Sequence, residues 1–272
     1  MRSGLTRQYS LTGDPQDGSR YRLGILRDPN SRGGSKAIHN EFQLGDPVRI
    51  GRPRNNFPLQ MGAARSILFA VGIGITPILS MAYALQELGA SWELHYCSRS
   101  ADRLAFRAEL ETFGDKVQLH LDDDSPPQKL DIDAVLNNPA IDRHLYVCGP
   151  NGFMDFVVEG AERAGWDPSC VHLERFGAEV DTNGAPFTVV AQKSGKTIEI
   201  APGETIAEQL VAHGVAVQVS CQSGVCGTCL TRVVEGMPDH RDLVQTETEK
   251  AGNRQITVCC SRSKTKTLVL DI

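Results

Sequence analysis

The stretch CQSGVCGTC, residues 221–229, places three cysteines at the spacing Cys-x4-Cys-x2-Cys. A fourth candidate follows thirty residues later, where Cys259 and Cys260 are adjacent. This spacing is the plant-type pattern for a [2Fe–2S] cluster, whose irons take soft, charged thiolates as ligands. The small residues between the cysteines let the backbone wrap closely and aim N–H groups at the cluster sulfurs. A zinc site is the alternative, but zinc modules usually show a second Cys-x2-Cys pair or added histidines.

Cys259 is predicted to be the fourth ligand, because its separation from the loop is the one usual for plant-type clusters. Cys260 then behaves as a small buried hydrophobic residue. Five of the eight cysteines lie in the segment 221–260, and the other three are scattered. Such clustering indicates a cluster site in a reducing compartment rather than a disulfide scaffold. The predicted cluster ligands are Cys221, Cys226, Cys229 and Cys259.

Length and composition narrow the class of protein. A chain of 272 residues is long enough for two ordinary domains or three small ones. Its net charge is -5 without a long basic stretch, which argues against nucleic acid as a partner. The sequence has no run of about 18 apolar residues that would predict a membrane-spanning helix, and its first residues lack the apolar core of a signal peptide. We therefore expect a soluble, cytoplasmic and monomeric protein with no membrane partner.

Residues from about 64 to 176 alternate apolar runs of strand length with helical patterns. The runs are Ser66–Val71, Glu93–Cys97, Val117–Leu121 and His144–Cys148. Between the first two lies a helix that Thr76 can cap, with Pro77 in its first turn and Gly89 at its end. Its apolar face comprises Ile78, Leu79, Met81, Ala82, Leu85 and Leu88. Strand–helix–strand alternation implies a parallel sheet.

The segments on either side show other patterns. Residues 1–58 are rich in Gly, Pro, Arg and Asn, with strand-like runs at Tyr21–Leu26 and Pro47–Ile50, which suits β structure with tight turns. Gly177–Pro186 indicates a linker, and a hairpin with its turn at Ser194-Gly195 follows. Further on, Thr246-x-x-Glu249 predicts a capping box at the start of a short helix.

The predicted strand Ser66–Val71 runs into the turn Gly72-Ile-Gly-Ile-Thr-Pro77. Glycines at a strand-to-helix turn let a pyrophosphate approach the backbone, and a helix N-terminus favours negative charge. The match is partial, since Pro77 stands where a dinucleotide fingerprint has its third glycine, and a plain tight turn is the alternative. A second glycine turn, Cys148-Gly149-Pro150, also ends a strand, where α/β sheets bind ligands. Arg99 follows a third strand and could contact the adenosine end or be a surface arginine.

Arg7-Gln8-Tyr9-Ser10 is a candidate flavin motif, because arginine can pair with a phosphate, tyrosine can lie on a flavin ring and serine can bond its edge. Together with the two glycine turns and the cysteine loop, in this order, the motif makes the whole chain resemble the phthalate dioxygenase reductase family. That family includes the vanillate O-demethylase reductase subunits. Other family-like stretches are Arg32-Gly33-Gly34-Ser35, Pro53-Arg54-Asn55, Phe57-Pro58-Leu59 and Asp239-His240-Arg241-Asp242.

The resemblance implies a multidomain chain of α/β and β structure. Residues 1–60 would form a flavin-binding β-barrel and residues 61–177 a parallel-sheet α/β domain for a nicotinamide nucleotide. Residues 178–186 would be a linker and residues 187–272 a β-grasp ferredoxin-like domain. Family members have more residues before the Arg-x-Tyr-Ser motif than the six found here. The barrel is therefore expected to be partial and truncated at its N-terminus.

The resemblance also implies residues for the cofactors. FMN would be held by Arg7, Tyr9, Ser10, Arg27, Arg32, Gly33, Gly34 and Ser35, with Phe176 packing near the flavin. The nucleotide would be bound by Gly72, Gly74, Thr76, Arg99, Cys148, Gly149 and Pro150. Thr76 and Cys148 would lie where nicotinamide meets flavin and are the predicted catalytic residues. NADH is the nucleotide that the family usually prefers.

The implied function is that of an NAD(P)H-dependent flavin iron–sulfur oxidoreductase. Electrons would pass from NADH through FMN and the [2Fe–2S] cluster to a Rieske-type oxygenase component, which acts on an aromatic acid or a related small substrate. The alternative is a stand-alone ferredoxin-like electron carrier whose flavin domain does not function.

Overall fold

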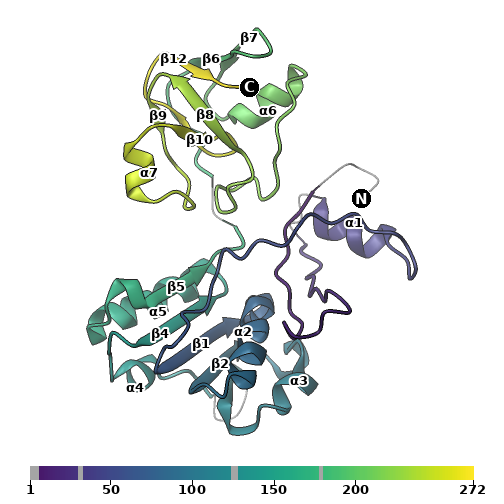
Figure 1. Ribbon diagram of the computed structural model, residues 1–272, viewed down its shortest axis with the longest axis vertical. Coiled ribbons are helices and arrows are strands. Elements are labelled where there is room, and N and C mark those ends of the chain that lie inside the picture. Colours follow the sequence, from purple (N-terminus) through teal and green to yellow (C-terminus); the bar gives the residue numbers. More distant parts are fainter. Residues whose placement is uncertain (1–5, 30–32, 124–127, 178–179) are drawn as a thin grey trace. The chain divides into compact units, whose positions relative to one another are not determined.

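The chain folds into two units, each with its own β-sheet (Figure 1). The structure is a computed structural model, and it describes residues 6–29, 33–123, 128–177 and 180–272. The N-terminal unit is Tyr9–Arg175, and the C-terminal unit is Phe176–Ile272 together with Met1–Gln8.

The sheet of the N-terminal unit has five parallel strands in the order β3-β2-β1-β4-β5. They are β1 (Arg65–Val71), β2 (Trp92–Ser98), β3 (Val117–Leu121), β4 (Arg143–Cys148) and β5 (Val171–Glu174). The four predicted strands are all present, each within one residue of its expected ends. The predicted parallel sheet is therefore confirmed, and β5 extends it by one strand that was not predicted.

Helices cover both faces of this sheet. The α-helices of the unit are α1 (Gly34–Glu41), α2 (Ile75–Glu87), α3 (Arg107–Glu111), α4 (Ile132–Leu136) and α5 (Asn151–Ala164). Short 3-10 turns are η1 (Gly72–Gly74), η2 (Ala101–Arg103), η3 (Gly114–Lys116) and η4 (Pro168–Cys170). Helix α2 packs on one face through a core that includes Leu68 and Tyr96. Helices α4 and α5 pack on the other face around Phe69 and Leu145 (Figure 1).

Helix α2 differs from the prediction in two details. Gly74 is its N-cap, and Thr76 lies inside the helix, where its hydroxyl donates to the Ile73 carbonyl at 2.9 Å. The prediction that Thr76 caps the helix is wrong, because the η1 turn leads directly into the helix, which begins two residues earlier than expected. Leu88 is 57% exposed, so it does not belong to the buried face, whereas the other predicted residues of that face are buried.

Residues 9–63 form little regular structure. An isolated bridge pairs Leu11 with Leu23, and α1 is the one helix in the described part of this segment. Tyr21–Leu26 and Pro47–Ile50 are not strands, so that prediction is wrong: a strand needs backbone partners, and the described residues offer these runs none beyond the bridge. The described residues of this segment close no barrel. Large apolar side chains stay exposed here, among them Tyr21, Leu26, Leu44, Val48, Ile50 and Met61.

The C-terminal unit has a mixed five-stranded sheet in the order β10-β8-β12-β6-β7, and a two-stranded sheet of β11 and β9. Its strands are β6 (Phe187–Ala191), β7 (Lys196–Ile200), β8 (Leu230–Glu235), β9 (Pro238–Asp239), β10 (Gln255–Thr257), β11 (Arg262–Ser263) and β12 (Thr267–Leu270). Its helices are α6 (Ile206–Ala212) and α7 (Glu247–Ala251). The predicted hairpin β6–β7 and the capping box of Thr246 and Glu249 are confirmed.

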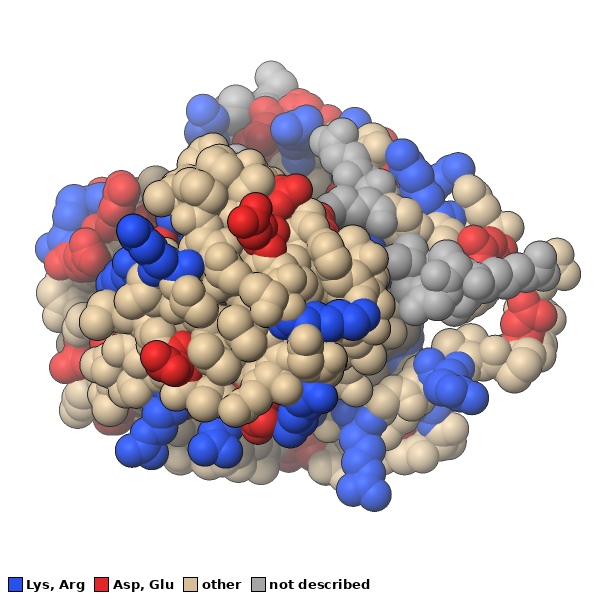
Figure 2. Space-filling view, turned by 90° about the horizontal axis from the view of Figure 1, so that it is seen from above, with Lys and Arg blue, Asp and Glu red and all other residues tan. Residues whose placement is uncertain are grey.

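Two surface properties bear on partners. Within the described ranges, no helix is long and apolar enough to cross a bilayer. Figure 2 shows a largely uncharged area on which single acidic and basic side chains are scattered. This face therefore lacks the strong field of one sign that steers polyanions to a protein.

Candidate functional site

The cysteine loop owes its path to residues in the left-handed region. Gln222, Gly224 and Gly227 have φ values of 55°, 72° and 68°. A Cβ on Gly224 would lie 2.6 Å from Cys260 Sγ and 3.1 Å from Asp242 Cα. Only glycine fits there without a shift of the neighbouring chain. The loop therefore packs directly against the segment that carries Cys259 and Cys260.

The four predicted ligands lie together in the C-terminal unit. Hydrogen bonds from Cys226 and Cys259 lower the pKa of the Cys221 thiol, and one from Cys259 lowers the pKa of Cys229. The backbone N–H of Ser223 also donates to Cys221 Sγ at 3.4 Å. Sulfurs close enough to share protons and backbone donors form a ligand set that iron can occupy in place of those protons.

These contacts join the four sulfurs in one chain, from Cys226 through Cys221 and Cys259 to Cys229. Among the described residues, no three His, Cys, Asp or Glu side chains form the ligand group of a single metal ion. A two-iron cluster takes two thiolates on each iron, so pairs of cysteines are the arrangement it requires. The donor set and the backbone N–H groups around it therefore fit a [2Fe–2S] cluster.

The neighbours of the two adjacent cysteines differ. Cys259 shares hydrogen bonds with Cys221 and Cys229. Cys260 is buried and lies 3.2 Å from Thr257 Oγ1, although it also bonds to Cys259. This difference supports Cys259 as the fourth ligand, with Cys260 filling the core beneath it.

The second candidate site lies at the carboxyl ends of β1 and β4. In the strand order, β2 and β3 lie on one side of β1, and β4 and β5 lie on its other side. This change of direction is the switch point at which open α/β sheets bind ligands. The predicted turns Gly72–Pro77 and Cys148-Gly149-Pro150 both lie at it, and α2 and α5 point their N-termini to the same edge.

Gly74 brings the two strand ends into contact. A Cβ there would lie 2.2 Å from the carbonyl oxygen of Cys148 and 2.8 Å from the backbone nitrogen of Gly149. Gly72 has a φ of 55° and open space around it. The turn thus combines close backbone packing on one side with an uncovered backbone on the other, where a phosphate can approach.

Thr76 and Cys148, the predicted catalytic pair, are both buried at this edge. Cys148 lies beside Glu174 in the register of β4 and β5, and burial raises the pKa of its thiol. Glu174 accepts a hydrogen bond of 2.9 Å from the Ser10 hydroxyl, and its own pKa is raised by burial. The structure therefore joins Ser10 of the flavin motif to the strand end that carries Cys148. Sequence reasoning missed Glu174, because β5 was not predicted and Ser10 lies 164 residues away in the sequence.

The other predicted residues are distributed as follows. Arg99 is exposed directly after β2, on the same sheet edge as Gly72. Arg27 donates to Asn40 Oδ1 at 3.2 Å, and Ser35 accepts from the backbone of Asp28, so both lie around α1, which Gly33 and Gly34 begin. Arg7 and Phe176 belong to the C-terminal unit, whereas Tyr9 and Ser10 belong to the N-terminal unit. Arg32 lies outside the described residues.

Comparison with known proteins assigns a domain family to each unit. A family described as "2Fe-2S iron-sulfur cluster binding domain" matches residues 189–264, and "Oxidoreductase NAD-binding domain" matches residues 68–159. The chain is 49% identical to a vanillate O-demethylase oxidoreductase of Pseudomonas putida, over 99% of this chain and 86% of that protein. The chain belongs to the phthalate dioxygenase reductase family.

Solved structures agree with this assignment. The structure of phthalate dioxygenase reductase, described as modular for electron transfer from pyridine nucleotides to [2Fe-2S], is similar with a TM-score of 0.70 and 40% identity, over 98% of this chain and 83% of that one. An intact type IV self-sufficient cytochrome P450 monooxygenase matches with a TM-score of 0.82 and 34% identity, and the chain spans 35% of its length. The predicted family, oxidoreductase class and cofactors, a [2Fe–2S] cluster, FMN and NADH, are confirmed.

Proposed function

We propose that this reductase carries electrons from NADH through FMN and its [2Fe–2S] cluster to a Rieske-type oxygenase that acts on an aromatic acid such as vanillate. The observation that carries the proposal is that one chain holds both a nucleotide-binding switch point and a four-cysteine loop. A plant-type cluster lies near about -400 mV and a Rieske centre at about -150 mV or above, so transfer to such a partner runs downhill.

At the nucleotide site, the chain binds NADH and orients it. Gly72 would offer its backbone to the pyrophosphate, and Gly74 holds that turn against Cys148 and Gly149. Gly149 and Pro150 lead into α5, and the N-termini of α2 and α5 add partial positive charge. Arg99, exposed beyond β2, would contact the adenosine end.

Where nicotinamide meets flavin, the residues exclude water and hold a proton. Thr76 and Cys148 are 2% and 0% exposed, so they exclude water from this place. Because burial raises the pKa of Cys148, its thiol stays neutral. Burial raises the pKa of Glu174, so its carboxyl group can hold a proton, while its Oε2 accepts a hydrogen bond from the Ser10 hydroxyl of the predicted flavin motif.

We propose the following residues for binding FMN and the [2Fe–2S] cluster. FMN would be held by Arg7, Tyr9, Ser10, Arg27, Arg32, Gly33, Gly34 and Ser35, with Phe176 beside it. The cluster would be held by Cys221, Cys226, Cys229 and Cys259. When bound, FMN would accept a hydride, which is two electrons and one proton, from NADH, and the cluster would pass electrons on one at a time. We further propose that the protein is a cytoplasmic monomer.

An anaerobic titration with NADH tests the function. About one and a half equivalents of NADH, which deliver the three electrons that the flavin and the cluster take together, should bleach both, and an excess of an oxidised Rieske oxygenase should restore both absorbances. NADH-dependent reduction of cytochrome c separates this function from that of a stand-alone ferredoxin-like carrier, which would show none. A cluster that stays oxidised while the flavin is reduced would contradict the proposal.

A further inference from the structure

Buried polar side chains without a hydrogen-bond partner gather around the cysteine loop. In the described part of the C-terminal unit, such side chains lie only in the stretches 220–223 and 240–245. These stretches touch each other, since the backbone N–H of Leu243 donates to Gly224 O at 3.0 Å and a Cβ on Gly224 would lie 3.1 Å from Asp242 Cα. Folded proteins pair nearly all their buried polar groups, so unpaired groups beside predicted ligands call for an acceptor or donor from elsewhere.

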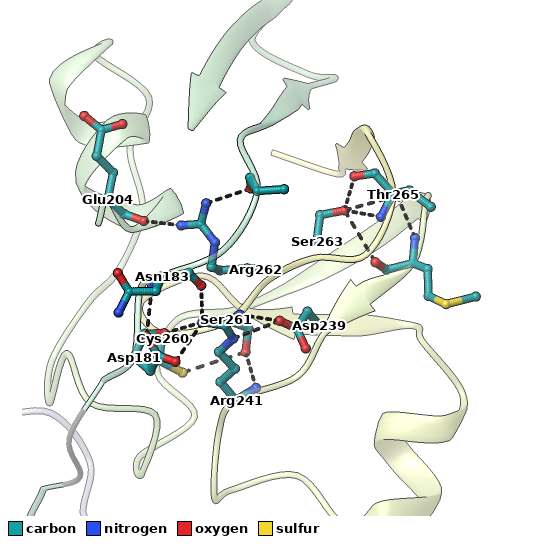
Figure 3. Close-up of polar contacts among 12 residues, drawn as sticks. Asp181, Asn183, Glu204, Asp239, Arg241, Cys260, Ser261, Arg262, Ser263 and Thr265 are labelled. Carbon is teal, nitrogen blue, oxygen red and sulfur yellow. Dashed lines mark hydrogen bonds and ion pairs between the residues drawn. The ribbon is translucent and has the colours of Figure 1, made fainter. Parts of the chain in front are cut away.

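Away from the loop, buried polar groups of this unit do have partners in the protein. Arg262 is 2% exposed, and its guanidinium donates to the carbonyls of Glu204 and Ala185 at 2.9 and 3.1 Å. The hydroxyl of Ser263 donates to the carbonyl oxygen of Thr265 at 2.8 Å. Figure 3 shows Arg262 and Ser263 with these partners. The unpaired groups are therefore a feature of the cysteine loop and its neighbouring stretch rather than of the whole unit.

The chemistry of the unpaired atoms separates acceptors from donors. Asp242 Oδ2, as part of a carboxylate, and Gln245 Oε1 can only accept hydrogen bonds, so they cannot bind to a negatively charged group. The ring of His240 already faces a carboxylate, because its Nδ1 lies 3.9 Å from Asp242 Oδ2. The hydroxyls of Ser220 and Ser223 can donate, and they are the hydroxyl donors of this set.

Ser220 and Ser223 flank Cys221, the first predicted ligand. The two serines are 2% and 3% exposed, and neither hydroxyl has a partner among the described residues. The backbone N–H of Ser223 donates to Cys221 Sγ at 3.4 Å, so this serine lies against the ligand sulfur. Ser220 is bonded covalently to the same cysteine. Both hydroxyls thus belong to residues that border the predicted position of the cluster.

A bound [2Fe–2S] cluster would bring the acceptors that these two hydroxyls lack. Its sulfide and thiolate sulfurs carry negative charge and accept hydrogen bonds. Reduction adds one more negative charge, so a donor at the sulfurs stabilises the reduced cluster more than the oxidised cluster. Hydrogen bonds to the sulfurs are among the factors that set the reduction potential of such clusters, and a further donor raises it.

We propose that the hydroxyl groups of Ser220 and Ser223 donate hydrogen bonds to sulfurs of the bound cluster and so raise its reduction potential. Neither serine is a ligand, and both act through the electrons that the sulfurs hold. The inference deepens the proposed function and rests on it for its consequence, because the potential of the cluster sets how readily it takes electrons from FMN. It gives a role to two residues of the loop besides the four cysteines.

An anaerobic reductive titration of the full, cluster-loaded protein tests this inference. Dithionite supplies the electrons, redox dyes report the potential, and the EPR signal measures the reduced cluster. In Ser220→Ala and in Ser223→Ala, the ratio of reduced to oxidised cluster at a fixed potential should fall about threefold, which is at the low end for a net hydrogen bond. For a one-electron couple, this is a shift of about 28 mV to more negative potential. Ser263→Ala is the matched control and should keep the parent potential, because its hydroxyl is bonded within the protein.

The outcomes are distinct. The parent potential in either loop variant overturns the proposal, since the hydroxyl would then face another acceptor such as a buried water. An equal shift in Ser263→Ala also overturns it. Should an alanine variant assemble no cluster, Ser220→Gly or Ser223→Gly removes the same hydroxyl and decides, and loss of the cluster there too contradicts a role confined to the potential. Because dithionite replaces NADH and FMN as the electron source, failure of NADH to reduce the cluster would contradict the proposed function alone.

Discussion

Replacing Gly74 by alanine should damage the nucleotide end of the reductase. The added Cβ would lie 2.2 Å from the Cys148 carbonyl oxygen and 2.5 Å from its carbon. Ordinary contact needs about 3.4 Å, so the turn and the end of β4 must separate by about 1.2 Å. Since the opposing atoms are backbone, no side chain can rotate away to relieve the contact.

Both stability and turnover should suffer. Overpacking a filled site costs about 1 to 3 kcal/mol, and a rigid backbone neighbour puts this substitution near about 3 kcal/mol. For a unit of this size that corresponds to a fall in melting temperature of about 6 to 12 °C. A displacement of about 1 Å at the reacting groups can cost about 100-fold in rate, so reduction of the flavin by NADH should slow by about that factor.

Two measurements and one control check this prediction. Thermal unfolding should be followed by far-UV circular dichroism and, separately, by cluster absorbance, which reports on the C-terminal unit alone. Gly152→Ala is the matched control, because a Cβ there meets no atom within 4 Å. It should leave stability unchanged or raise it by up to about 1 kcal/mol, as expected for alanine replacing glycine in a helix. A Gly74→Ala protein with the parent melting temperature and flavin reduction rate would refute the contact between the strand ends.

Three further predictions address the other residues. Cys259→Ser should abolish the visible absorbance of the cluster while Cys260→Ser keeps it; the reverse result would reassign the fourth ligand. Gly224→Ala should lose most of the cluster, whereas Gly203→Ala, with a similar positive φ but open space, should cost only about 1 kcal/mol of stability; equal behaviour of the two variants would count against the close approach to Cys260. Burial raises the pKa of Glu174, so the folded state holds its proton more tightly than the unfolded state and stability falls as pH rises above the unfolded value near 4.5. Glu174→Gln should flatten this loss in unfolding measurements between pH 4 and 8, and an unchanged slope would argue against a buried carboxyl.

The sequence predicted the N-terminal sheet well because its strands are continuous apolar runs. Ser66–Val71 and His144–Cys148 are buried on both faces, and such runs leave little choice of structure. Thr76 was misplaced because a capping hydroxyl and one inside a first turn have the same local sequence; only the η1 turn decides between them.

Contacts between distant parts of the sequence could not be predicted. Residues 181–185 have the composition of a linker, and their structure comes from Arg241 and Arg262, which lie about sixty to eighty residues away. Glu174 belongs to the candidate site only because β5 pairs with β4 and because Ser10 reaches it. Position along the chain gives no sign of either contact.

Glycines shape the backbone at both candidate sites, beside the side chains that would bind the cofactors. A relay of electrons needs no general acid or nucleophile, so its residues must mainly bring groups close together. Gly74 does this at the switch point, and Gly224 does it at the cysteine loop, each with a built Cβ less than 3 Å from a neighbouring atom. The backbone geometry within each candidate site thus depends on contacts that no other residue permits. Alanine at these two glycines should consequently impair electron transfer more than Ser10→Ala, which removes a hydroxyl and leaves the backbone in place.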